Sequence, residues 1–304
     1  MKVLLTGATG FIGRKIAFQL SKLGHELVIL ARNPTKAQES LPQATFAAWD
    51  SLVSRPPLTA LVGVEAVIHL AGEPVAEKRW SNTQKTRIYE SRILGTRHLM
   101  EALKASDGEG PRVIVSASAI GFYGDRGDEV VDETSLAGSD FLAKVCVDWE
   151  REFFTNAPTS ARKVGVRIGV VLGPDGGALA KLLPVFRTGM GGPVGSGKQW
   201  MSWIHVDDLV KLILTALSDA RFEGMVNAVS PNPVRNREFA ESMGHALHRP
   251  SIMPVPGFVL KLALGEMSEV VLGGARVLPK RAREFGFEFG YPELSGALQE
   301  IVKS

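Results

Sequence analysis

Short apolar runs rich in β-branched residues alternate with longer segments of helical periodicity from residue 1 to about residue 170. Between the first two runs, Ile12, Ile16, Leu20 and Leu23 recur at helical spacing before Gly24, which predicts a helix over residues 11–23. Near-continuous apolar strands alternating with helices are typical of a parallel sheet covered on both faces. The predicted strands are residues 2–6, 26–31, 44–49, 65–71, 112–118 and 165–173.

The pattern loosens after residue 173, where a turn cluster follows at 173–177 and five glycines fall within residues 189–197. We therefore predict an α/β protein with a doubly wound parallel sheet in residues 1–173 and a smaller α/β substrate lobe in residues 174–304, interleaved with the first. Further expected elements are helices at 207–217, 235–248 and 292–302 and a strand at 225–229.

Residues 2–13 read KVLLTGATGFIG, an apolar strand followed by three spaced glycines and a helix. In such a loop Gly7 allows the tight turn, Gly10 lets the backbone approach a pyrophosphate, and Gly13 lets the helix pack closely on the strand. The phosphates then bind at the helix N-terminus. The strand, loop, helix and second strand give the context that a Rossmann-type dinucleotide site requires, and a plain strand–turn–helix is the alternative.

The second predicted strand ends LARNP, with Arg32 and no carboxylate. An acidic residue there binds the ribose 2′-hydroxyl of NAD, whereas an arginine accepts the 2′-phosphate of NADP. The sequence therefore favours NADP(H) over NAD(H). Arg32 as a solvated loop residue remains the alternative.

The composition is that of a soluble globular protein, with 45% hydrophobic and 22% charged residues among 304. The net charge of +3 arises from interleaved charges, so no nucleic-acid partner is expected. The single cysteine, Cys146, excludes an internal disulfide and fits a cytoplasmic location. No apolar run predicts a membrane span, and His245 and His248 have no third ligand, so no metal site is expected.

Four segments, GATGFIG, HLAG (69–72), VSASAIGFYG (115–124) and WIHVDD (203–208), together resemble the extended short-chain dehydrogenase/reductase superfamily of nucleotide-sugar epimerases and dehydratases. LAGEPVAEKRW, FLAKVCVDWE, SPNPVRN and LGGARVLPKR resemble, more narrowly, its atypical "epimerase family protein" branch, which carries a short characteristic C-terminal domain. The resemblance covers nearly the whole chain. It implies a Rossmann core, bound NADP(H) and a cleft closed by the C-terminal lobe, but no particular reaction.

The resemblance implies cofactor contacts in the glycine loop, at the strand ends and on two helices. Asp50 has a strand-end turn as its alternative role, and Arg92 a solvated helix face. His69 is expected to be a packed strand residue rather than a base. The implied cofactor-binding residues are Gly7, Thr9, Gly10, Phe11, Ile12, Gly13, Arg32, Asp50, Leu70, Ala71, Gly72, Arg92, Ser116, Lys144 and Val170.

The superfamily's catalytic set is a serine or threonine after the fifth strand and a Tyr-x-x-x-Lys pair on the next helix. Aligned from that strand, Ser118 takes the serine position and Lys144 the lysine position, but Asp140 stands where the tyrosine is expected. Because the tyrosine carries the proton in such enzymes, its loss puts catalysis in doubt. Tyr123, in the GFYGD turn, is the candidate substitute acid.

The glycine-rich stretch 189–197 and the aromatic residues after it are interpreted as a mobile wall over the substrate. Arginines at the cleft would suit an anionic group, and each has a surface ion pair as its alternative. Asp207 and Asp208 are expected to cap a helix. The candidate substrate contacts are Arg79, Trp80, Trp200, Trp203 and Arg235.

Two hypotheses of function follow. The first is an NADP(H)-dependent epimerase or oxidoreductase that acts on a small polar or sugar-like molecule by hydride transfer, with Ser118 polarising the reacting oxygen and Lys144 orienting the ribose. The second is a catalytically silent NADP(H)-binding sensor or scaffold. The glycine-rich, aromatic loop supports the first, and the missing tyrosine supports the second. No membrane partner is expected, and a homodimer is one option that the resemblance leaves open.

Overall fold

A seven-stranded, fully parallel sheet forms the centre of the computed structural model, which describes residues 1–106 and 110–303. Its strand order is β3-β2-β1-β4-β5-β7-β11, so the order reverses between β1 and β4. In doubly wound sheets a nucleotide binds at such a reversal, outside the carboxyl ends of the strands. The predicted doubly wound sheet is confirmed. The strands are β1 Lys2–Thr6, β2 Glu26–Ala31, β3 Thr45–Ala48, β4 Ala66–His69, β5 Val113–Ala119, β7 Arg162–Ile168 and β11 Gly224–Ala228.

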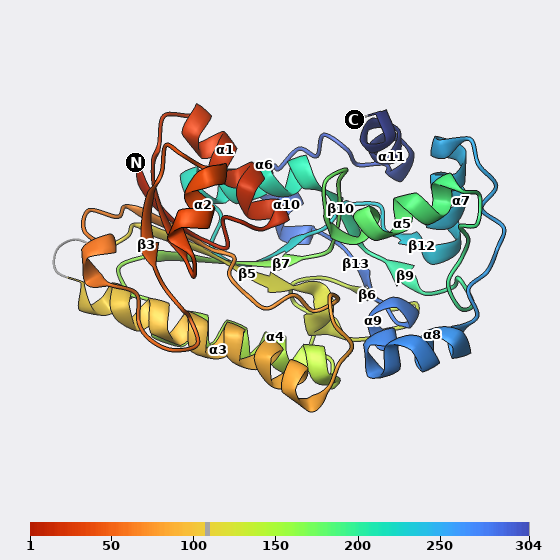
Figure 1. Ribbon diagram of the computed structural model, residues 1–304, viewed down its shortest axis with the longest axis horizontal. Helices are drawn as coiled ribbons and strands as arrows, with labels where there is room; N and C mark the ends of the chain where they lie inside the picture. The colour runs from red at the N-terminus through yellow and green to blue at the C-terminus, as the bar shows by residue number, and fades with distance from the viewer. Residues whose placement is uncertain (107–109, 304) are drawn as a thin grey trace.

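Helices cover both faces of this sheet (Figure 1). The helices α1 (Phe11–Lys22) and α6 (Val206–Ser218) lie on one face, and α3 (Asn82–Ala105) and α4 (Phe141–Asn156) lie on the other. Side chains alternate accordingly along β1. Leu5 packs in one apolar cluster with Ile16 of α1, while Leu4 packs in the other with Leu99 of α3. The short helix α2 (Pro34–Ser40) connects β2 and β3.

The second lobe has its own apolar core, in which α5 (Gly177–Arg187), α7 (Asn236–Leu247) and α11 (Leu294–Lys303) meet around Trp203. Two two-stranded pairs join it to the first lobe, β8 with β10 and β6 with β13, and a third pair, β9 with β12, lies within the second lobe. The remaining elements are β6 Val130–Val131, β8 Val170–Leu172, β9 Trp200–Met201, β10 Trp203–His205, β12 Val234–Arg235, β13 Arg276–Val277, α8 Gly257–Leu264, α9 Glu269–Leu272, α10 Lys280–Glu284 and the 3-10 turns η1 Leu58–Ala60, η2 Ile120–Tyr123 and η3 Gly265–Ser268.

Two features differ from the sequence-based expectation. The single strand expected at 165–173 is split at Gly169, where a Cβ would lie 2.7 Å from the Ser202 carbonyl oxygen, so that β7 stays in the main sheet and β8 pairs with β10. The chain also enters α5 directly after the glycine cluster, where no helix was expected. Residues 174–304 also contribute to the first lobe, because β11 is a strand of the central sheet and α6 packs on one face of it.

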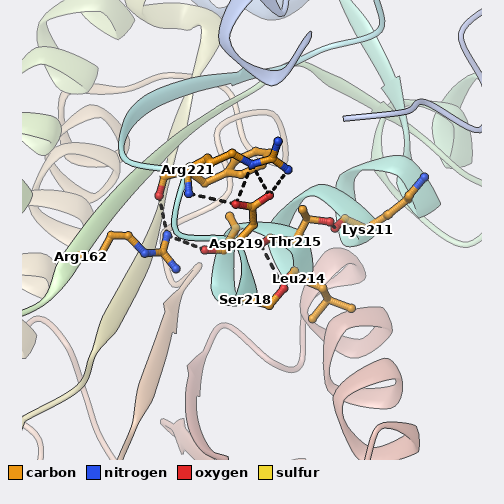
Figure 2. Close-up of polar contacts among 9 residues, drawn as sticks. Arg162, Lys211, Leu214, Thr215, Ser218, Asp219 and Arg221 are labelled. Atoms are coloured by element: carbon orange, nitrogen blue, oxygen red, sulfur yellow. Dashed lines mark hydrogen bonds and ion pairs between the residues drawn. The ribbon is translucent and has the colours of Figure 1, made fainter. Parts of the chain in front are cut away.

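Arg162, at the start of β7, fixes the end of α6 to the sheet (Figure 2). Its guanidinium donates to the carbonyls of Ala216 and Leu217, at 2.8 and 3.0 Å, and to that of Phe222. The last carbonyls of a helix have no partner within the helix, so this arginine satisfies groups that would otherwise need water. Asp219 is held beside it by Arg221.

Candidate functional site

A cavity of about 420 Å³ lies at the carboxyl ends of β1 and β4, where the strand order reverses. It joins the predicted glycine loop to the turn after β4, to β8 and to the first residues of α5. The structure thus brings together residues that are far apart in the sequence. The lining residues are Gly7, Gly10, Phe11, Ile12, Gly13, Leu70, Val170, Val171, Gly177 and Ala178.

The glycine loop leaves no room for side chains. Gly7 has φ +72°, and a Cβ on it would lie 2.8 Å from the Leu70 carbonyl carbon. A Cβ on Gly13 would lie 2.2 Å from the Gly7 oxygen. Gly10 begins α1 without a side-chain cap, so the first N–H groups of the helix remain available to an anion. These residues fit the diphosphate of a dinucleotide.

Thr6, which the sequence-based reasoning missed, holds the turn against this loop. Its hydroxyl oxygen accepts hydrogen bonds from the backbone N–H groups of Leu70 and Ala71, both at 3.1 Å. His69 lies behind it, fully buried, and burial lowers the pKa of His69 to about 4. His69 is therefore the packed strand residue that was expected. The signal for Thr6 is a hydroxyl at the last position of β1, directly before the first glycine.

Phe11 connects the glycine loop to the second lobe. A Cβ on Gly173 would lie 2.6 Å from its ring, and one on Gly176 would lie 2.5 Å from it. The turn before α5 therefore requires glycines because the Phe11 ring packs directly on its backbone. This contact makes the start of α5 one wall of the cavity.

Of three other predicted cofactor residues, Arg32 and Asp50 follow β2 and β3, and Ser116 lies in the middle of β5. Arg32 is exposed at the end of β2, and among the described residues its guanidinium has no hydrogen bond or ion pair. Asp50 accepts a bond from the Leu52 N–H at 3.0 Å, the turn role weighed as its alternative. Ser116 is 1% exposed within the sheet and does not line the cavity, so its side chain is not placed to bind a cofactor. Thr9 is exposed in the glycine loop.

Arg92 extends from α3 towards the turn after β4. Its Nη1 donates to the carbonyls of Glu73 and Ile88, both at 3.0 Å, and its guanidinium stacks on the ring of Trp149. The guanidinium carbon would lie 3.4 Å from a Cβ on Gly72. Arg92 is therefore anchored beside the cofactor turn rather than on a solvated helix face.

The register of α4 corrects the predicted catalytic lysine. Lys144 is exposed, with no hydrogen bond or ion pair in the described part of the chain. The side of α4 that faces the end of β5 carries Leu142 and Cys146, whose side chains contact Gly121, and Glu150 one turn further on. Two side chains four residues apart and facing β5 are what the Tyr-x-x-x-Lys pair requires. On the face of α4 that approaches Gly121, the two positions four residues apart are Leu142 and Cys146, neither of which is a tyrosine or a lysine.

Ser118 and Tyr123 belong to a buried hydrogen-bonded network. Ser118 donates to Glu150 Oε1 at 2.6 Å, and Glu150 forms a two-point ion pair with Arg167. The Tyr123 hydroxyl accepts from Arg167 at 3.0 Å and donates to Asn227 at 2.8 Å. Tyr123 is fully buried, and burial raises its pKa to about 12. The Ser118 proton is committed to Glu150, and the Tyr123 hydroxyl cannot reach a substrate, so this geometry opposes both predicted catalytic roles.

The structure does not bring all of the predicted substrate residues together. Trp203 is fully buried in the core of the second lobe and donates to the Asn232 carbonyl, so it is not a substrate contact. Trp200 and Arg235 do lie together: the Arg235 guanidinium is 4.2 Å from the Trp200 ring centroid, and both side chains donate to Asp128. Trp80 is 9% exposed and packs on Phe141, and Arg79 is exposed.

The segment 189–197 is packed rather than free. A Cβ on Gly192 would lie 2.1 Å from the Met253 carbonyl oxygen, and Gly195 donates to the Val255 carbonyl at 2.9 Å. Gly192 is needed because the backbone of Met253 runs close beside it, and these contacts do not fit the free loop that the expected mobile wall requires. Over residues 1–106 and 110–303, the structure contains no helix long and apolar enough to cross a membrane. No cluster of three metal-ligating side chains occurs in the same ranges.

Comparison with known proteins gives matches over the whole chain. A model of the NAD dependent epimerase/dehydratase family matches residues 3–228, and a domain of unknown function (DUF1731) matches residues 255–301. The chain is 45% identical over its full length to the epimerase family protein SDR39U1 homolog, chloroplastic, of Arabidopsis thaliana, covering 87% of that protein. It is 35% identical to the epimerase family protein YfhF of Bacillus subtilis, covering 99% of this chain and 98% of the relative. A crystal structure of human epimerase family protein SDR39U1 with NADPH superposes with a TM-score of 0.90, at 33% identity and covering 100% of both chains.

Proposed function

The chain belongs to the NAD-dependent epimerase/dehydratase family, and from this premise we propose that it binds NADP(H) and acts on a small polar substrate by hydride transfer. The proposed preference for NADP(H) over NAD(H) rests on Arg32. It stands at the end of β2 with no partner in the described chain, where a 2′-phosphate would meet it. Lys36, exposed in the first turn of α2, adds a second cation nearby. The NADPH in the structure of human SDR39U1 supports the same choice.

When bound, NADPH supplies a hydride, and the chain's own residues hold it. The glycine loop and the α1 N-terminus bind the diphosphate, while Thr6 fixes the turn at Leu70 and Ala71 that forms the opposite wall. Of the α4 side chains that approach Gly121, neither Leu142 nor the buried Cys146 is a proton donor at neutral pH. If a carbonyl carbon accepts the hydride, its oxygen therefore takes a proton from water, which leaves an alcohol, NADP⁺ and hydroxide.

A second candidate, a catalytically silent NADP(H)-binding sensor or scaffold, is favoured by one observation. The α4 side chains that approach Gly121 are Leu142 and Cys146, and neither donates a proton at neutral pH, because Leu142 is apolar and burial raises the pKa of Cys146 to about 12. Screening NADPH oxidation against aldehydes, ketones and sugar derivatives separates the two candidates. Turnover of any member supports the enzyme, and complete inactivity of a protein that binds NADPH supports the sensor.

Cofactor choice is tested by fluorescence titration with NADPH and NADH. We expect the protein to bind NADPH about tenfold or more tightly than NADH, because a charge-assisted contact to a phosphate is worth about 1.4 kcal/mol or more. Arg32→Ala should remove the preference by weakening NADPH binding alone. Arg55→Ala, an exposed arginine paired with Glu101, is the matched control and should leave both affinities unchanged. Equal affinity of the wild-type protein for the two nucleotides would overturn the NADP(H) proposal.

A further inference from the structure

The helix α8 presents large apolar side chains to solvent. None of its eight residues is buried, and Phe258 and Leu262 are 74% and 79% exposed. Val259 is exposed as well, and it lies on the same side because residues three and four apart are neighbours on a helix surface. The opposite side of α8 packs through Leu264 on the cluster that contains Trp80. One face of α8 is therefore held by the protein, and the other is apolar and uncovered in the described chain.

The short helix α9 extends this apolar face. Val270 and Val271 are exposed, and the end of α9 returns to the start of α8, where a Cβ on Gly257 would lie 3.5 Å from the Leu272 side chain. Both helices lie at the edge of the second lobe (Figure 1). The α8 patch is defined as Phe258, Val259, Leu262, Val270 and Val271.

The two longest helices, α3 and α4, have a different surface. None of their large apolar side chains is exposed, and ion pairs such as Arg97–Glu152 and Arg151–Asp148 lie on the outside of the protein there. On α8, by contrast, the only charged side chain is Lys261. A contiguous exposed apolar patch of this kind marks an interaction site.

The size of the α8 patch fits the pairing of two copies. Side chains of this kind at these exposures present on the order of 100 Å² each, so the five together offer about 500 Å² per copy. Two such patches placed face to face bury about 1,000 Å², the size at which a protein–protein interface becomes specific. This area is apolar before any polar rim is added.

Two opposite charges flank the patch. Lys261 precedes Leu262 on α8, and Glu269 begins α9, and over residues 1–106 and 110–303 neither side chain has an ion pair or hydrogen bond. The neighbouring Glu266, by contrast, pairs with Lys85. A copy related by a two-fold axis presents the same two charges in the reverse order, so each lysine meets a glutamate. An anionic lipid surface would attract Lys261 but repel Glu269, which favours a second copy as the occupant.

We propose that the α8 patch is the interface of a two-fold symmetric dimer of this chain. Phe258 and Leu262 pack on the same residues of the second copy, and Lys261 of each copy pairs with the partner's Glu269. The inference is independent of the proposed function, because no residue of the α8 patch lines the cavity at the glycine loop.

The test is sedimentation velocity of the full chain over a range of concentrations. We expect the wild-type protein to sediment as a dimer, and the double variant Phe258→Ser/Leu262→Ser to dissociate about a hundredfold or more readily, because apolar anchors at the centre of an interface dominate its affinity. Phe18→Ser/Leu23→Ser is the matched control, since both side chains are exposed and lie outside the patch, and it should remain dimeric. Circular dichroism spectra of both variants should match that of the wild type. A wild-type protein that is monomeric at every concentration would overturn the proposal, as would an unchanged dissociation constant in Phe258→Ser/Leu262→Ser.

Charge reversal tests the two-fold arrangement. Lys261→Glu and Glu269→Lys should each weaken the dimer about tenfold or more, because like charges then face each other across the interface. The double variant Lys261→Glu/Glu269→Lys restores opposite charges and should recover the wild-type dissociation constant. A double variant as weak as the single ones would overturn the arrangement.

Flotation with vesicles of phosphatidylglycerol and phosphatidylcholine tests a lipid surface as the occupant. We expect the wild-type protein not to float with the vesicles. Vesicle binding that is lost in Phe258→Ser/Leu262→Ser would assign the α8 patch to a lipid surface and overturn the dimer.

Discussion

The hydroxyl of Thr6 and the imidazole of His69 lie within hydrogen-bond distance, with Oγ1 and Nδ1 2.8 Å apart. Because Thr6 Oγ1 already accepts from Leu70 and Ala71, its own proton points to Nδ1. The other ring nitrogen, Nε2, then carries the hydrogen and donates to Thr96 Oγ1 at 3.1 Å, where Trp149 Nε1 also donates. A buried chain of hydrogen bonds thus connects the end of β1, at the glycine loop, with the indole on which Arg92 stacks.

This chain predicts that the protein loses stability in mild acid. Burial lowers the pKa of His69 to about 4 in the folded state, against 6.5 when unfolded. The unfolded state therefore binds more protons between these values, so the contribution of His69 is complete above pH 6.5 and is lost as the pH falls towards 4. The expected loss in the free energy of unfolding from pH 7.5 to pH 5 is about 2 kcal/mol, measured by urea denaturation.

The control is His69→Asn, whose amide does not titrate and whose Oδ1 can take the place of Nδ1 opposite Thr6. Groups that titrate in both proteins, such as Glu133, whose pKa is raised by burial, cancel in the comparison. If wild type and variant lose the same free energy between the two pH values, His69 is not the titrating group.

A second prediction concerns Gly13. In Gly13→Ala the new Cβ would lie 2.2 Å from the Gly7 carbonyl oxygen, which is backbone and cannot rotate away. We expect NADPH binding to be lost and the free energy of unfolding to fall by about 1–3 kcal/mol, as in other overpacked sites. Gly296→Ala in α11, where a Cβ meets nothing within 4 Å, should instead stabilise by about 0.5–1 kcal/mol. Retained NADPH affinity in Gly13→Ala would contradict the close packing of loop and helix.

The parts of the fold predicted from sequence are those set by local pattern. The strands at 2–6 and 26–31 are found at those bounds, because continuous apolar runs ending in turns leave little choice of structure. The glycine loop was also predicted, and the structure gives the reason for two of its glycines, because a Cβ would lie 2.8 Å from the backbone on Gly7 and 2.2 Å on Gly13. The surroundings of Trp203 and Asp208 could not be predicted from local pattern. Trp203 is an indole covered by α7 and α11, and Asp208 accepts from the N–H groups of Gly290 and Tyr291, a partner distant in sequence, instead of capping α6.

The candidate site was less predictable, because the number of residues between β5 and a motif position on α4 depends on the length of the loop between them. Counting from β5 assigned Lys144 to the lysine position, whereas in the structure Lys144 is exposed and Cys146 is the α4 side chain near Gly121, just after β5. A signal was present in the helix itself: Val145, Trp149 and Phe153 recur at helical spacing and are buried, which places Lys144 away from the protein interior. The place of Arg92 beside the turn after β4 followed from the family resemblance and not from local pattern, because it depends on α3 and α4 packing side by side.

The ion pair of Arg167 and Glu150 gives a third prediction. Both side chains are nearly buried, at 5% and 11% exposed, and joined at two points. Arg167→Met leaves the carboxylate buried without its cation, so we expect a loss of about 3–5 kcal/mol in the free energy of unfolding. The double variant Arg167→Met/Glu150→Leu removes both charges and should be more stable than Arg167→Met. A double variant that is less stable than this single one would contradict the assignment of the cost to an unpaired charge.

Tyr123→Phe tests whether the one tyrosine next to the end of β5 takes part in chemistry. The hydroxyl is fully buried between Arg167 and Asn227. Its removal should cost about 1–2 kcal/mol in the free energy of unfolding, because the Arg167 guanidinium and the Asn227 amide each lose a hydrogen-bond partner. NADPH affinity and the rate of any NADPH oxidation found by screening should stay unchanged, because no substrate atom can approach the ring. Thermal denaturation and steady-state rates at matched fractions of folded protein give the two readouts. A fall in rate of about a hundredfold or more with unchanged NADPH binding would restore Tyr123 as the proton donor, since a general acid typically contributes that much.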